Sequence, residues 1–234
     1  MESYQVIILA AGQGKRMKAN INKQFITIGS EPLLAHTIAV FEQDDWCDSI
    51  YLVIQEMDRE MIESVVAEKQ FSKVKKCVTG GKERQDSVRL GLEAVDPSKI
   101  TMIHDGARPF VTQDELHRLH KATQNTGAAF LAVPVTDTIK QFDGDRVKTL
   151  KRSELFAAQT PQAFRYDLIH RAHEWAYNQG IQATDDVQLL ELMEQPIELV
   201  KGSYRNMKLT TPEDIQRAEN MLQINRQSIQ EEEL

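Results

Sequence analysis

The chain has 234 residues, a length that suits one large α/β domain or two small ones, and 41% of them are hydrophobic, which is enough for a packed core. Its 28 Lys and Arg against 35 Asp and Glu give a formal charge of −7, so the whole molecule does not attract nucleic acid or an anionic membrane. Apolar runs such as 6–11 and 128–135 are too short to cross a bilayer, and we expect a cytoplasmic protein without an export signal. The two cysteines, Cys47 and Cys77, have no spacing typical of a disulfide framework or a zinc site.

Short β-branched runs alternate with longer segments of helical period along the whole chain. This pattern predicts an α/β fold, a Rossmann-like three-layer sandwich in which helices cover both faces of a mostly parallel sheet. The predicted strands, in chain order, are residues 5–9, 49–54, 75–78, 101–104, 128–134 and 198–200. Helices are expected between them.

Three helix boundaries have local signals. Thr112 to Glu115 forms a capping box, in which the hydroxyl and the carboxylate satisfy each other's free amides. Thr211 and Pro212 repeat this start with proline at the first helical position. An apolar stripe from Leu168 to Ala176 ends at Gly180, which is typical of a helix terminus.

Residues 138–142 and 146–150 differ from the other strands because they are polar and flank an Asp-Gly-Asp turn. They predict a β-hairpin with little to bury. An isolated two-stranded hairpin is marginal in water, so we expect this arm to pack against something outside its own domain, most simply a second subunit. Residues 227–234 contain three consecutive Glu and are expected to be a disordered acidic tail.

The segment Ala10-Ala-Gly-Gln-Gly-Lys-Arg-Met17 directly follows the first predicted strand. Small residues let backbone amides approach a triphosphate, and the following cations, including Lys23, neutralise it. Met17 stands where a dinucleotide fingerprint needs Gly or Ala, and Arg16 stands where a Walker A motif needs Ser or Thr. Taken alone, the segment indicates either a phosphate-binding loop of another kind or an ordinary strand-to-helix turn.

Two further segments follow predicted strands. Gly80 to Val88 contains a glycine pair that permits close ligand contact at the carboxyl end of the sheet, although a loop with solvated charges would look similar. His104 to Pro109 places Asp105 at the same edge, where it could hold Mg²⁺ or a ribose hydroxyl, or form a structural pair with Arg108. His104 is interpreted as a packing histidine, since ionised phosphoryl oxygens need no base.

In their order and spacing, these three segments resemble the 2-C-methyl-D-erythritol 4-phosphate cytidylyltransferase family of the non-mevalonate isoprenoid pathway. The resemblance runs from about Val6 to Glu213. Further matching segments are residues 134–138, 150–152, 159–162, 183–186 and 206–214. It implies a single nucleotidyltransferase domain, residues 1–226, of the nucleotide-diphospho-sugar transferase type, with a protruding dimerisation arm at about 136–155.

The resemblance implies transfer of CMP from CTP to the acceptor phosphate by in-line attack, without a covalent enzyme intermediate. By this likeness Arg16 and Lys23 would stabilise the transition state, and Arg152 and Lys208 would position the acceptor phosphate. The implied nucleotide-binding residues are Ala10, Ala11, Gly12, Gly14, Lys15, Gly81 and Ser87. The implied acceptor-binding residues are Asp105, Gly106, Arg108, Thr138, Thr160 and Thr184.

The cofactor implied is Mg²⁺, held mainly by the CTP phosphates, with Asp105 as a possible ligand. A homodimer is implied as well, in which Thr138 and Arg152 of one chain complete the nucleotide site of the other. One alternative is a ribitol-5-phosphate or other alditol-phosphate cytidylyltransferase. Another is a nucleotide-binding domain without turnover. Residues 86–88 and 184–186 favour methylerythritol phosphate as the acceptor.

Overall fold

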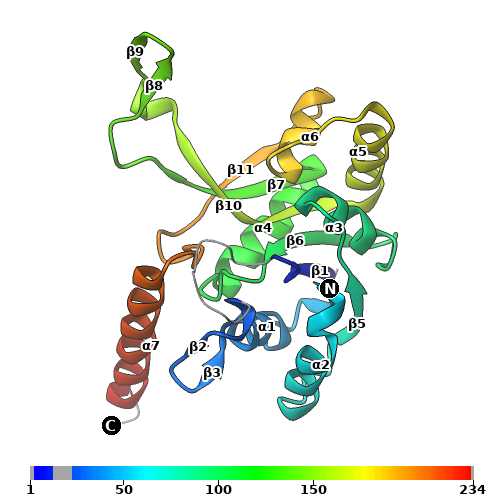
Figure 1. Cartoon of the computed structure of the whole chain (residues 1–234), viewed down its shortest axis with the longest axis vertical. Helices are drawn as coiled ribbons and strands as arrows, with labels where there is room; N and C mark the ends of the chain where they lie inside the picture. The colour runs from blue at the N-terminus through cyan, green and yellow to red at the C-terminus, as the bar shows by residue number, and fades with distance from the viewer. Residues whose placement is uncertain (1–2, 13–22, 233–234) are drawn as a thin grey trace.

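The computed structural model describes residues 3–12 and 23–232, with the backbone alone for Lys23 and residues 224–232. In these residues the central sheet has seven strands (Figure 1). Their spatial order is β11 (Glu198–Lys201), β7 (Ala128–Pro134), β10 (Phe156–Arg165), β6 (Ile100–Asp105), β1 (Tyr4–Leu9), β4 (Cys47–Ile54) and β5 (Val74–Thr79). The predicted α/β class and all six predicted strands are confirmed.

The strand β10 is absent from the sequence prediction. It runs antiparallel to both of its neighbours, β6 and β7, whereas the other pairs in the sheet are parallel. Its sequence contains Pro161, which has no N–H for a strand ladder and argues against a central strand. The structure accommodates this proline where the register with β7 shifts, between Ala158 and Gln162. Such a bulge needs no ladder hydrogen bond from the proline.

Helices cover both faces of the sheet, because successive side chains of a strand point to opposite sides. Val6 and Ile8 belong to the core beneath α1 (Leu33–Glu42), α2 (Arg59–Glu68) and α4 (Gln113–Thr126). Ile7 belongs to the core beneath α3 (Arg84–Leu92), α5 (Tyr166–Gln179) and α6 (Asp186–Leu192). The result is the predicted three-layer sandwich.

The predicted helix boundaries agree with the structure. Thr112 Oγ1 accepts from the Glu115 amide at 3.3 Å, and Glu115 Oε2 accepts from the Thr112 amide at 2.9 Å, which starts α4. The helix α5 ends at Gly180, whose φ of +64° suits glycine. The final helix, α7 (Pro212–Glu232), begins at the predicted proline. Its backbone continues through residues 227–232, where the sequence led us to expect a tail without regular structure.

The segment 23–32 holds three short elements, the 3₁₀ turn η2 (Lys23–Phe25) and the paired strands β2 (Thr27–Ile28) and β3 (Glu31–Pro32). The helix α7 lies beside this pair (Figure 1), and Leu209 and Ala218 pack there against Ile28. Among the helices of residues 3–12 and 23–232, none is both long and apolar enough to cross a membrane.

The predicted hairpin is present as β8 (Lys140–Asp143) and β9 (Arg146–Thr149), which project away from the sheet (Figure 1). Gly144, in the turn, has a φ of +60°. Phe142 and Val147 face each other across the two strands, and their exposed fractions are 71% and 62%. The arm thus presents an apolar pair to solvent on an otherwise polar hairpin.

Candidate active site

A cavity of about 410 Å³ lies at the carboxyl ends of β1 and β6 and at the start of α3. Open α/β sheets bind ligands at this edge. Among the predicted site residues that the structure describes, seven line it, namely Ala11, Gly12, Gly81, Ser87, Asp105, Gly106 and Lys208. The fold therefore brings the implied nucleotide segments together with Asp105 and with Lys208, which is distant in the sequence.

One wall of the cavity consists of small residues and backbone. Ser87 Oγ accepts a hydrogen bond from the Gly81 amide at 3.1 Å, and Gln55 Nε2 donates to the carbonyl of Ala11. A Cβ added to Gly80 would lie 2.7 Å from Cβ of Ala11, so glycine is needed for the two loops to approach this closely. Ala10 is fully buried behind this wall. Such a wall suits a flat base and ribose recognised through backbone groups.

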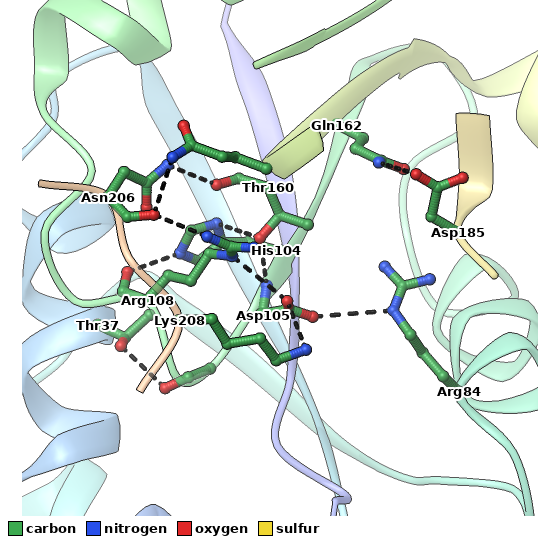
Figure 2. A network of polar contacts seen from close by, with 12 residues as sticks. Thr37, Arg84, His104, Asp105, Arg108, Thr160, Gln162, Asp185, Asn206 and Lys208 are labelled. Carbon is green, nitrogen blue, oxygen red and sulfur yellow. Dashed lines mark hydrogen bonds and ion pairs between the residues drawn. The ribbon is translucent and has the colours of Figure 1, made fainter. Parts of the chain in front are cut away.

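Also at the cavity, the carboxylate of Asp105 faces three cationic side chains (Figure 2). Its Oδ2 lies 2.9 Å from Lys208 Nζ and 3.5 Å from Arg108 Nε, and its Oδ1 lies 3.8 Å from Arg84 Nε. Burial acts to raise the pKa of Asp105, but Lys208, Arg84 and Arg108 outweigh burial and hold that pKa well below its usual value. Asp105 is therefore an ionised anchor for a group of cations.

Thr160 hydrogen-bonds to the backbone of Asp105, and His104 in turn contacts Thr160. The Asp105 amide donates to Thr160 Oγ1 at 3.0 Å, and that oxygen lies 3.2 Å from His104 Nδ1. His104 Nε2 lies 3.0 Å from the carbonyl of Arg108, and burial lowers the pKa of His104 to about 4. Neutral His104 thus donates from Nε2 to this carbonyl and accepts at Nδ1 from the Thr160 hydroxyl. His104 is a packing histidine, as predicted, and the Thr160 hydroxyl is engaged inside the protein rather than facing the cavity.

Arg108 joins Asp105 to the segment that carries Lys208. Its Nη1 donates to the carbonyl of Asn206 at 2.7 Å, and its side chain is nearly buried. The structural Asp–Arg pair that the sequence left open is therefore present. It fixes the position of Lys208 at the cavity.

The sequence did not single out Arg84, which also lines the cavity. Arg84 Nη2 lies 2.8 Å from Oδ2 of Asp186, and Asp186 Oδ1 lies 3.1 Å from His173 Nε2. Asp186 and His173 are each only 1% exposed. The only signal for Arg84 was its place in the segment after β5, which also contains Lys82.

Of the remaining predicted residues, those that the structure describes do not line this cavity. Thr138 and Arg152 are exposed at the base of the arm, where Arg152 begins the 3₁₀ turn η4 (Arg152–Glu154) and donates to the carbonyl of Thr136 at 2.9 Å. Thr184 is exposed before α6. Gly14, Lys15 and Arg16, and the side chain of Lys23, lie outside what the structure describes.

A largely parallel sheet with a backbone-lined pocket facing fixed cations is the architecture of a nucleotide-dependent α/β transferase. Comparison with known proteins leads to the same class of enzyme. The model of the 2-C-methyl-D-erythritol 4-phosphate cytidylyltransferase family matches residues 4–224, and the chain belongs to this family. It is therefore a nucleotidyltransferase by family.

Among the similar sequences is the 2-C-methyl-D-erythritol 4-phosphate cytidylyltransferase of Halalkalibacterium halodurans, 52% identical over 220 residues, covering 94% of this chain and 96% of the relative. That of Geobacillus kaustophilus is 49% identical, covering 94% and 97%. Among solved structures, the 4-diphosphocytidyl-2C-methyl-D-erythritol synthase of Anaerococcus prevotii superposes with a TM-score of 0.85 at 33% identity, covering 95% of this chain and 96% of that one.

Proposed function

We propose that this protein transfers CMP from CTP to 2-C-methyl-D-erythritol 4-phosphate, giving 4-diphosphocytidyl-2-C-methyl-D-erythritol and pyrophosphate, as a step in isoprenoid precursor synthesis. The observation that carries the proposal is that Gly81 and Ser87 line the same cavity as Asp105 and the cation paired with it, Lys208. The family membership supports both the nucleotide and the acceptor.

A cytoplasmic location follows from the proposed substrate, since CTP is an intracellular metabolite.

In the proposed reaction, an oxygen of the acceptor phosphate attacks the α-phosphorus of CTP, the new P–O bond forms, and the bond to pyrophosphate breaks. The acceptor phosphate is ionised at neutral pH, so no general base is required. Both substrates are anions, and the protein must oppose their repulsion with fixed cations. Lys208 and Arg152 would hold the acceptor phosphate, and Arg16 and Lys23 would stabilise charge on the α-phosphate and the leaving group.

The expected metal is Mg²⁺, which neutralises charge on the triphosphate when bound. Within residues 3–12 and 23–232, the carboxylates that line the cavity are those of Asp105 and Glu83. Both oxygens of Asp105 face cationic side chains, which would repel a metal ion. Since Mg²⁺ keeps several waters and binds substrate phosphates readily, a phosphate-held ion fits these residues. We therefore propose that Asp105 orders the surrounding cations and contacts hydroxyls of the acceptor.

We further propose a homodimer in which the arm reaches the partner's cavity. The support is that Thr138 and Arg152, both implied in acceptor binding, lie outside the cavity of their own chain. The apolar pair of Phe142 and Val147 on the arm is exposed in the single chain and would be covered by a second copy.

The direct test offers the purified protein CTP and Mg²⁺ with either methylerythritol 4-phosphate or ribitol 5-phosphate and follows pyrophosphate release. We expect faster turnover of methylerythritol 4-phosphate. Faster turnover of ribitol 5-phosphate would replace the proposed acceptor by an alditol phosphate. CTP binding without pyrophosphate release from either acceptor would indicate a nucleotide-binding domain.

A further inference from the structure

The first two residues of α3 connect the nucleotide side of the cavity to the segment between α5 and α6. We call residues 180–185 the acceptor loop, because it carries Thr184. Gln85 Nε2 donates to the carbonyl of Ile181 at 3.0 Å, and Gln85 Oε1 accepts from the Ala183 amide at 2.9 Å. One amide side chain thus pairs with this backbone at two points. Two such hydrogen bonds fix both the position and the orientation of the loop.

Arg84, the preceding residue, contacts Asp186, the residue that directly follows the loop. Its Nη2 lies 2.8 Å from Oδ2 of Asp186, the first residue of α6, and its Nε lies 3.8 Å from Asp105. Asp186 is held further by His173, and its amide donates to Oε1 of Gln162 at 3.1 Å. An ionised carboxylate that is 1% exposed needs such partners, because an unpaired buried charge is strongly destabilising. Arg84 therefore links the carboxylate at the end of β6 to the carboxylate at the start of α6.

Arg84 and Gln85 belong to the same short segment, residues 81–87, that lines the nucleotide side of the cavity. Four residues before Gln85, Gly81 lines the nucleotide wall, and Ser87 follows in the first turn of the same helix. The acceptor loop therefore has a fixed position relative to the nucleotide wall, although the two are about one hundred residues apart in the sequence. In a reaction whose rate depends on placing two substrates in line, that relative position matters directly.

We propose that Arg84 and Gln85 are positioning residues, which set the acceptor loop and Asp105 at the correct place relative to bound CTP. The inference rests on the proposed function for its acceptor. It assigns the two side chains no contact with the reacting atoms. Loss of either should weaken productive acceptor binding and leave CTP binding nearly unchanged.

The first test is Gln85→Ala. We expect the KM for methylerythritol 4-phosphate to rise about tenfold, as for a misplaced substrate, with the KM for CTP within about twofold of wild type. The matched control is Gln113→Ala. Gln113 Nε2 also donates to a backbone carbonyl, that of Gln43 at 3.0 Å, but the residue does not line the cavity. The control should change neither KM.

Arg84→Lys tests the contacts of Arg84 with Asp105 and Asp186. Lysine keeps the charge, but a single ammonium cannot reproduce the fork that faces Asp105 and Asp186 together. We expect a lower kcat and a higher acceptor KM than wild type, and a larger loss in Arg84→Gln. Partial rescue by lysine, with the CTP KM unchanged in both variants, separates positioning from a general loss of folding.

Amide hydrogen exchange gives a readout that needs no turnover. In Gln85→Ala the Ala183 amide should exchange faster, because it loses its acceptor, while amides of β6 keep their wild-type rates. Unchanged exchange at Ala183, or an unchanged acceptor KM in an active enzyme, would overturn the proposal. An equal rise in both KM values would overturn it as well. If the wild-type protein transfers no CMP, the proposed function fails, and the exchange rate of Ala183 still decides whether Gln85 fixes the loop.

Discussion

Lys208 Nζ lies 2.9 Å from Oδ2 of Asp105, so a lysine near the end of the domain is paired with a carboxylate at the end of β6. The two residues are 103 positions apart in the sequence, and both line the cavity. Arg108 holds the same carboxylate and the carbonyl of Asn206, two residues before this lysine. Lys208 is therefore held in place before an anionic substrate arrives, which is what electrostatic catalysis requires.

Replacing Asp105 with Asn should leave three neighbouring cations without their common counter-charge. We expect Asp105→Asn to lower kcat/KM on the order of a hundredfold, because Lys208 and Arg84 would repel each other and shift. The Mg²⁺ concentration that gives half-maximal activity should stay within about twofold of wild type, since the ion is proposed to bind phosphates. A tenfold higher Mg²⁺ requirement would instead make Asp105 a metal ligand.

His104 should make stability depend on pH. Its pKa is lowered to about 4 in the folded protein by burial, against about 6.5 when unfolded. The unfolded chain therefore binds more protons between these values, and the stability contributed by neutral His104 is complete above about pH 6.5 and is lost as the pH falls towards 4. The free energy of unfolding should decrease on the order of 3 kcal/mol across this window.

Urea unfolding at several pH values measures this effect. His104→Gln removes the titrating group and should flatten the decrease. The control is His36→Gln, because His36 Nε2 also contacts a backbone carbonyl, that of Ile28 at 2.9 Å, but is not fully buried. If the wild type and His104→Gln lose stability in parallel, another group is responsible.

If the arm forms the dimer interface, dimerisation and acceptor binding should depend on each other. Phe142→Ser combined with Val147→Ser should shift the protein from dimer to monomer in analytical ultracentrifugation and raise the acceptor KM at least tenfold, with the Tm of the chain nearly unchanged. The side chains are exposed in the single chain, so their loss removes little of its own core. Met57→Ser, at an 89% exposed residue away from the arm, is the control. A double variant that stayed dimeric with unchanged acceptor KM would contradict the proposed interface.

The cations of the nucleotide loop should act mainly on the chemical step. We expect Arg16→Ala or Lys23→Ala to lower kcat on the order of a hundredfold or more, as for the loss of a transition-state donor. Pre-steady-state release of pyrophosphate measures that step directly. Weaker CTP binding at unchanged kcat would show a role in binding alone.

Local chemistry in the sequence predicted much of the fold. The six predicted strands follow from short β-branched runs, and the start of α4 follows from Thr112 and Glu115, which lie three residues apart. The arm follows from the turn at Gly144. Motif order also predicted seven residues that the fold does bring to one cavity.

The tertiary structure decided what depends on neighbours distant in the sequence. A proline such as Pro161 is disfavoured in a central strand, yet β10 lies inside the sheet, because a bulge accommodates the proline and β10 pairs with β6 and β7 on either side. Likewise, nothing near Arg84 in the sequence indicates that it meets Asp186. Local propensity is encoded within a few residues, whereas the partner of a buried charge depends on which strands and helices become neighbours.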